Sequence, residues 1–65
     1  MDLFITERER RLLKALRRFA ESLEVAAERA GMSMAEAGAA FVVLELAGRA
    51  ERVDGGLVRR TLEAD

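Results

Sequence analysis

The sequence predicts a mainly α-helical domain in which three helices are followed by a C-terminal two-stranded β-hairpin. Three observations indicate this arrangement. Capping motifs precede stretches with apolar residues at helical spacing, glycines stand where two of the helices would end, and a strand–turn–strand pattern follows Gly48. A chain of 65 residues has room for one domain, which we expect to span residues 1–65.

The first helix is indicated by a capping box at Thr6-Glu7-Arg8-Glu9, in which the side chains of Thr6 and Glu9 each satisfy the other residue's backbone amide. Apolar residues then recur at helical spacing at Leu12, Leu13, Leu16 and Phe19. This pattern predicts a helix over roughly residues 7–21. All three phenylalanines, Phe4, Phe19 and Phe41, are expected in the core.

Two further helices follow at short spacing. Ser22 is placed to cap a helix that runs through Ala30, and Gly31 stands where a left-handed residue would end it. The capping box Ser33-Met34-Ala35-Glu36 opens a third helix that runs to about Ala47, and Gly48 ends it. The connection around Gly31 is only three residues long, which is typical of a helix-turn-helix. Met32 and Met34 flank this turn and are expected to fill gaps in the core.

The hairpin is predicted from strands at 51–53 and 57–61 that flank Asp54-Gly55-Gly56. Asp-Gly is a strong hairpin signal, and it predicts a turn with positive φ at both Asp54 and Gly55. A lone hairpin is marginal in water, so it must pack on the helices. Three helices and such a terminal hairpin define a small winged helix-turn-helix.

Missing residue types exclude several functions. The chain contains no His, Cys, Asn, Gln, Tyr, Trp or Pro. Without His or Cys it offers no imidazole base, no thiol nucleophile and no zinc-binding thiolate or imidazole. We therefore expect no enzymatic activity, no metal, no cofactor and no small-molecule ligand. The longest wholly apolar run, residues 37–44, is too short to span a membrane, and we expect a cytoplasmic bacterial protein without a membrane partner.

Residues 22–60 resemble the C-terminal winged-helix domain of the DNA-processing protein A (DprA/Smf) family. The resemblance is carried by the segments 22–33, 44–52 and 55–56, which read SLEVAAERAGMS, LELAGRAER and GG. The string Leu44-Glu45-Leu46-Ala47-Gly48, followed by Glu51-Arg52 and the double glycine, is its most particular part.

This resemblance implies a role in DNA processing during natural transformation and recombination. Proteins of the family bind incoming single-stranded DNA and help to load the recombinase RecA. A Rossmann-like domain carries their main DNA site, and this chain does not contain it. The resemblance therefore implies an accessory module.

The third helix lacks the side chains that read bases. Specific readout in the major groove relies on Arg or Lys at guanine and on Asn or Gln at adenine. Within residues 34–47 the only charged residues are Glu36 and Glu45. Sequence-specific reading by this helix is therefore not expected.

Positive charge gathers elsewhere. Residues 6–20 hold six basic and two acidic side chains, and residues 49–60 hold four basic and two acidic ones, whereas residues 21–48 hold only Arg29 against five Glu. Clustered cations suffice for non-specific contact with phosphates. The candidate DNA-binding residues are Arg10, Lys14, Arg17, Arg18, Arg52, Arg59 and Arg60. The alternative is that the arginines of the first helix form a solvated face with pairs such as Glu7 and Arg11.

The third helix is also apolar on the side that faces away from the expected core. At about 100° per residue, one side carries Ala37, Ala40, Phe41, Leu44 and Ala47, assigned to the core. The opposite side carries the candidate interface residues Ala35, Gly38, Ala39, Val42, Val43 and Leu46. Exposed apolar patches commonly mark contact surfaces, so we expect a homodimer or a protein partner here. The alternative is that Leu3-Phe4-Ile5 or the hairpin folds over this side.

Two functional classes follow. The chain is either an accessory module that contributes protein contacts and at most weak, non-specific DNA binding, or a stand-alone winged-helix transcription regulator. The missing base-reading side chains favour the first.

Overall fold

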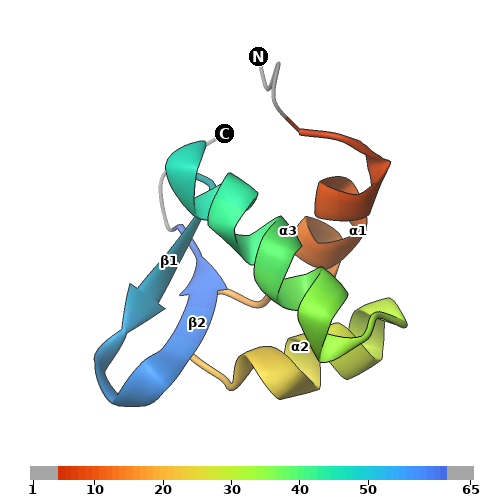
Figure 1. The fold of residues 1–65 in the computed structure, drawn as a ribbon. Coiled ribbons are helices and arrows are strands. Elements are labelled where there is room, and N and C mark those ends of the chain that lie inside the picture. The colour runs from red at the N-terminus through yellow and green to blue at the C-terminus, as the bar shows by residue number, and fades with distance from the viewer. Residues whose placement is uncertain (1–4, 62–65) are drawn as a thin grey trace.

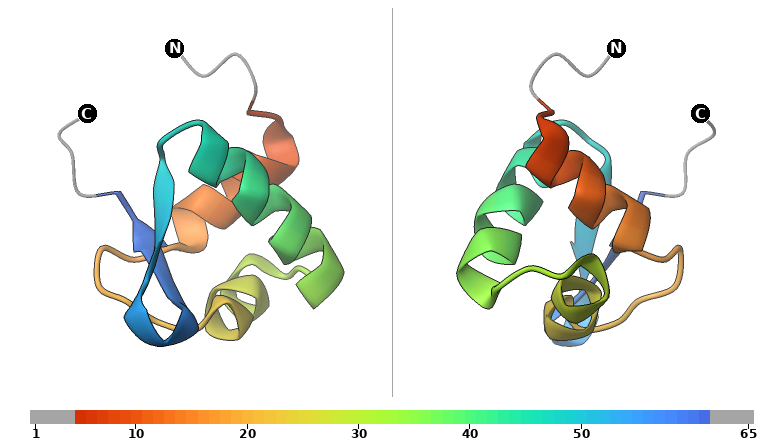
Figure 2. Two further views of the ribbon diagram at one scale, coloured as in Figure 1. Left: turned by 60° about the vertical axis from the view of Figure 1, so that its left-hand side comes forward. Right: turned by 90° about the vertical axis from the view of Figure 1, so that its right-hand side faces the viewer.

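The structure is a computed structural model that describes residues 5–61, and it contains the predicted three helices and two-stranded antiparallel hairpin (Figure 1). In chain order the elements are α1 (Glu7–Ala15), α2 (Leu23–Ala30), α3 (Met34–Leu46), β1 (Ala50–Val53), a 3-10 turn (Asp54–Gly56) and β2 (Leu57–Arg60). The three helices pack against one another, and the hairpin extends to one side of them (Figures 1 and 2). The predicted fold is confirmed.

Side-chain caps begin all three helices, as predicted. Thr6 donates to Glu9 Oε1 through its backbone N–H, at 2.7 Å, and through its hydroxyl. Glu9 is only 2% exposed, and these hydrogen bonds from Thr6 hold the pKa of its carboxyl below the ordinary value. At α3 the Ser33 hydroxyl accepts from Glu36 N–H at 3.1 Å, while Glu36 accepts from Ser33 N–H at 3.0 Å. Ser22 caps α2.

Glycines end the helices where the sequence predicts. Gly31 lies at the end of α2 with φ 71° and ψ 35°, a left-handed conformation in which its N–H reaches the carbonyl groups of the last turn of the helix. Gly48, at φ 76°, follows α3. The helix-turn-helix connection is therefore set by local backbone chemistry.

The prediction for the hairpin turn is wrong in one detail. The strands pair from Ala50 with Arg60 to Val53 with Leu57, so the loop is three residues long. Positive φ falls on Gly55 and Gly56, and Asp54 does not adopt it. A three-residue loop places its left-handed positions after Asp54, where the two glycines accept them without steric cost.

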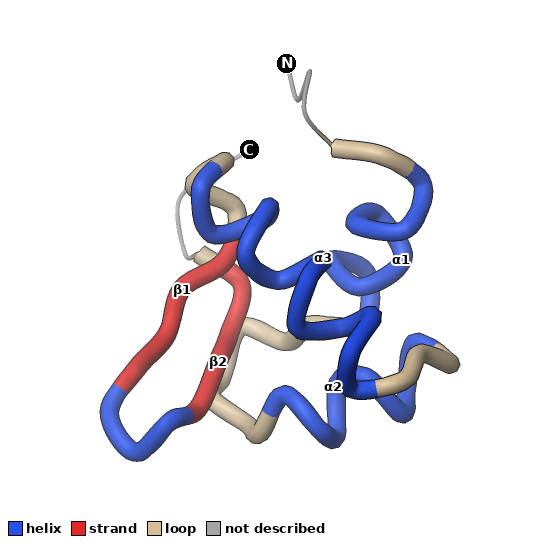
Figure 3. Tube along the Cα trace, viewed as in Figure 1, coloured by secondary structure: helices blue, strands red, loops and turns tan. Residues whose placement is uncertain are grey.

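The first helix is shorter than predicted. It ends at Ala15, and Leu16 is already extended, with φ −70° and ψ 144°. The following segment, residues 16–22, runs beside β2 (Figure 3), where Glu21 exchanges both backbone hydrogen bonds with Val58 at 3.0 and 2.8 Å. Arg60 N–H also donates to the Arg17 carbonyl at 2.8 Å. Residues 16–22 thus serve as a partial third strand, which anchors the hairpin to the helices.

Two predicted core positions are exposed. Phe19 is 64% exposed because it lies in the segment beside β2 and not on a continued helix. Met34 is 49% exposed in the first turn of α3, where it lines a shallow hollow beside α2, whereas Met32 is buried as predicted. Phe4 lies outside the described residues.

The core is built around the inner face of α3. Ala37, Ala40, Phe41 and Leu44 are all completely buried, as predicted. Leu12 from α1, Ala26 from α2 and Val58 from β2 join them in one cluster. Every element of the fold therefore packs toward one side of α3, and its other side is left facing outward.

The two glycines of the helix-turn-helix should respond to alanine in opposite directions. Gly31→Ala should lower the free energy of unfolding by about 1–2 kcal/mol, because a Cβ is strained at its positive φ. Gly38→Ala should raise it by about 0.5–1 kcal/mol, because Gly38 is helical and an added Cβ meets no atom within 4 Å. Urea unfolding measures both, and a change of the same sign in both variants would contradict this account.

Candidate nucleic-acid and protein interfaces

The outward face of α3 consists of the candidate interface residues Ala35, Gly38, Ala39, Val42, Val43 and Leu46. Leu46 is 84% exposed and Val42 is 46% exposed. Gly38 has open space where a Cβ would stand. Ala35, Ala39, Val42 and Leu46 are exposed, as their predicted outward direction requires, whereas Gly38 and Val43 are half-buried. This face presents an apolar surface to solvent.

The hairpin does not cover this face. From the hairpin, Arg52 reaches the edge of α3, where its guanidinium lies 4.9 Å from the centre of the Phe41 ring and 3.5 Å from the Glu45 carboxylate. These contacts fall along one edge of α3 and leave Val42 and Leu46 exposed. Ile5 is buried in the core cluster, while Leu3 and Phe4 lie outside the described residues. The part of the alternative that invoked the hairpin is therefore wrong.

A second surface is basic and involves α1. Arg10 and Lys14 from α1 meet Arg49 and Arg60, from the two ends of the hairpin's base, around one shallow hollow. Its apolar lining comes from Ile5 and Leu13. The structure thus brings together three of the predicted DNA-binding residues, Arg10, Lys14 and Arg60, from distant parts of the sequence.

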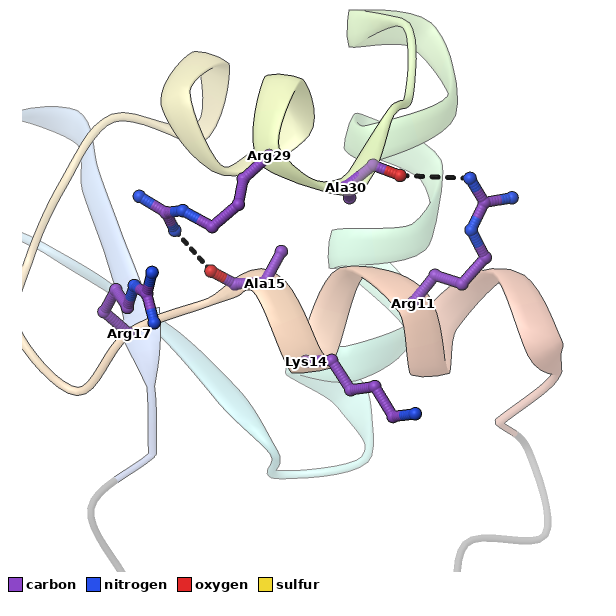
Figure 4. Close-up of a pocket in the computed structure, with 6 residues that line it drawn as sticks. All are labelled: Arg11, Lys14, Ala15, Arg17, Arg29 and Ala30. Atoms are coloured by element: carbon purple, nitrogen blue, oxygen red, sulfur yellow. Dashed lines mark hydrogen bonds between the residues drawn. The ribbon is translucent and has the colours of Figure 1, made fainter.

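A neighbouring hollow that Lys14 also lines contains two arginines that cap helix ends (Figure 4). Arg11 of α1 donates to the Ala30 carbonyl at the end of α2, at 3.0 Å. Arg29 of α2 donates to the Ala15 carbonyl at the end of α1. A cation is favourable at a helix C-terminus, where carbonyl groups lack intrahelical partners.

Arg29 also forms a bidentate ion pair with Glu21, with N–O distances of 2.8 and 2.9 Å. The Arg29 guanidinium holds the pKa of the Glu21 carboxyl below its ordinary value of 4.5. Sequence reasoning gave Arg29 no role, although it is the one basic residue within the acidic segment 21–48. Its position as a lone basic residue among glutamates could have indicated that Arg29 forms an ion pair.

The remaining candidate residues are dispersed. Arg17 lines the second hollow, and Arg18 is exposed in the segment before α2. Arg59 pairs with Glu51 across the hairpin at 2.7 Å, and Arg52 pairs with Glu45. The positive charge of the hairpin is therefore partly neutralised in place. In Figure 4, Lys14 points away from both capping arginines.

The two surfaces lie on different sides of the domain, because α1 packs behind α3 (Figures 1 and 2). One is apolar, with Glu36 and Glu45 at its edges, and the other is basic. No helix within residues 5–61 combines the length and apolar character needed to cross a membrane.

The helix-turn-helix with its hairpin wing places the chain in the class of winged-helix domains. Residues 6–56 match the family model described as the DprA winged helix domain. Because this match covers most of its length, the chain belongs to the DprA winged helix domain family, as the sequence resemblance implied. No curated protein and no solved structure compared with the chain matches it.

The ion pair between Glu21 and Arg29 predicts a pH-dependent contribution to stability. Because the pKa of Glu21 is lowered in the folded state, this contribution is present above about pH 4.5 and is lost as the pH falls through the lowered value. Glu21→Gln should lower the midpoint of thermal unfolding by a few degrees at pH 7, because the ion pair with Arg29 is lost. The loss is limited to a few degrees because the backbone pairing of residue 21 with Val58 remains.

The deficit of this variant should shrink as the pH is lowered below 4.5. Thermal scans followed by circular dichroism across this range measure it. Glu24→Gln, a substitution at an exposed position on α2, serves as the matched control. A deficit that is independent of pH would refute the assignment.

Proposed function

We propose that the chain is an accessory module of a DNA-processing system, that it makes its main contact with protein through the outward face of α3, and that it touches DNA only weakly and without sequence preference. The observation that carries this proposal is the exposure of Val42 and Leu46 on the second helix of the helix-turn-helix. This helix usually enters the major groove in DNA-reading members of the fold.

The chemistry of the outward face supports protein contact over base reading. It offers no hydrogen-bond donor that could reach a base edge, since α3 carries no basic residue and the sequence has no Asn or Gln. Its two carboxylates, Glu36 and Glu45, would repel phosphates. An apolar centre with charged residues at its edge is instead the usual composition of a protein interface.

A weak phosphate contact is supported by the basic hollow. Arg10, Lys14 and Arg60 line it together with Arg49, and clustered cations attract the nucleic-acid backbone regardless of sequence. Such a contact would hold DNA against α1, away from the outward face of α3. The role is one of binding alone, since the chain has neither His nor Cys for catalysis.

Amide chemical shifts of the ¹⁵N-labelled chain, titrated with single- and double-stranded oligonucleotides, test this proposal. Shifts should gather on α1 and at the end of β2 around Arg10, Lys14 and Arg60. They should weaken steeply between low and near-physiological salt, because binding releases counterions. The amides of residues 35–46 should not move.

Two charge reversals provide the matched comparison. Lys14→Glu should abolish the shifts because Lys14 lines both hollows, whereas Arg52→Glu, the same change of charge beside α3, should leave them intact. Shifts that begin on α3 and are lost in Arg52→Glu would overturn the proposal. They would indicate a stand-alone regulator that reads DNA with α3.

A further inference from the structure

We infer that the occupant of the outward face of α3 is a second copy of this chain, docked by antiparallel, two-fold symmetric pairing of the two α3 helices. This inference rests on the proposed function, because it names the protein that the face contacts. It is supported by the order of side-chain sizes on this face, where small residues lie toward the N-terminal end of α3 and large ones toward its C-terminal end.

The outward face has a small half and a large half. Ala35, Gly38 and Ala39 occupy the N-terminal half, and Val42, Val43 and Leu46 occupy the C-terminal half. At Gly38 a Cβ would meet no atom within 4 Å, so this half carries little side-chain volume and is open to solvent. Leu46, at 84% exposure, projects at the other end.

A two-fold axis perpendicular to α3 places the large half of each copy on the small half of the other. When this axis passes between residues 40 and 41, position 35 stands level with 46 of the partner, 38 with 43, and 39 with 42. Ala35 and Ala39 are thereby matched with Leu46 and Val42 of the partner, whereas Gly38 and Val43 lie on opposite edges of the face, about 140° apart around the helix. A parallel pairing would instead set Leu46 against Leu46 and leave a gap between the small residues.

The charges at the edges of the face are compatible with this pairing. At about 100° per residue, Glu36 and Glu45 fall on opposite edges of the outward face. The perpendicular two-fold axis makes each edge face the same edge of the partner, so Glu36 does not meet the Glu45 of the other copy. Glu45 also has Arg52 beside it, at 3.5 Å.

The same symmetry produces a charge complement. Arg52 has a side chain that is 54% exposed and lies along the edge that carries Glu45, near the C-terminal end of α3. On the partner, Arg52 would meet the N-terminal end of the same edge, at Met34. There Glu24 and Glu28 of α2 line a shallow hollow together with Met34. Each copy would therefore present Arg52 to an acidic hollow of the other, twice per dimer.

The area available sets the strength of the contact. Residues 35–46 span only about 16 Å of helix, so the buried area falls below the ~1,200–2,000 Å² of a standard interface. The association is therefore reversible and depends on concentration. A two-fold dimer is also the commonest form of homo-oligomer.

Disulfide trapping tests this geometry, because the chain has no cysteine of its own and each variant then carries a single thiol. Ala35→Cys and Leu46→Cys, mixed in equal amounts and oxidised, should form a mixed disulfide. Neither variant should crosslink with itself, because its two copies of the same position would lie roughly 16 Å apart, beyond the ~7 Å reach of a disulfide.

Two controls accompany the mixture. Lys14→Cys, an exposed position on α1, mixed with Leu46→Cys gives the background of random collision. Gly38→Leu, introduced into both partners, should abolish the mixed disulfide by adding bulk to the small half, while open space at this position lets each copy keep its fold. Circular dichroism verifies the fold of every variant.

Each outcome decides the inference. A mixed disulfide that forms faster than the background and is lost with Gly38→Leu supports it. Self-crosslinking of either variant would show parallel pairing and overturn it. Crosslinking no faster than background would overturn self-pairing, while the oligonucleotide titration would still decide separately whether α3 reads DNA.

Discussion

The packing of Phe41 and Leu44 into the core is the contact on which the rest of the structure depends. Both side chains are fully buried, and α1, α2 and β1 each pack against the helix that carries them. Only one side of α3 is buried in this way. A helix that is apolar all round is ordinarily buried all round. The outward face of α3 departs from this rule, because Val42 and Leu46 remain exposed.

The early end of α1 is the second constraint, and it determines the basic surface. Arg29 of α2 binds both the Ala15 carbonyl and Glu21, at the two ends of the segment that leaves the helix and pairs with β2. That pairing draws the end of the hairpin against α1 and places Arg60 at the same hollow as Arg10 and Lys14. An α1 that continued to residue 21 would occupy this space and separate the cations.

The sequence was sufficient to predict those features of the fold that depend on interactions between residues close together in the chain. Helix starts at Thr6, Ser22 and Ser33 are set by side chains within three residues, and Gly31 ends α2 through its own backbone. The side of α3 that faces the core followed from periodicity alone.

Long-range contacts explain what sequence reasoning missed. The apolar spacing through Phe19 continued the helical pattern, but the segment instead forms backbone hydrogen bonds with Val58 and Arg60, far away in the sequence. The basic hollow draws on α1 and both ends of the hairpin, so charge counting showed which segments were positive but not which side chains meet.

The central claim, that the outward face of α3 is a protein contact, is tested most directly by light scattering over a range of concentrations. The account predicts that the mass rises with concentration from 7.2 kDa toward twice that value, and that Val42→Glu/Val43→Glu stays at 7.2 kDa with unchanged helicity. A mass that never rises above 7.2 kDa, or that rises equally in the double variant, would contradict it.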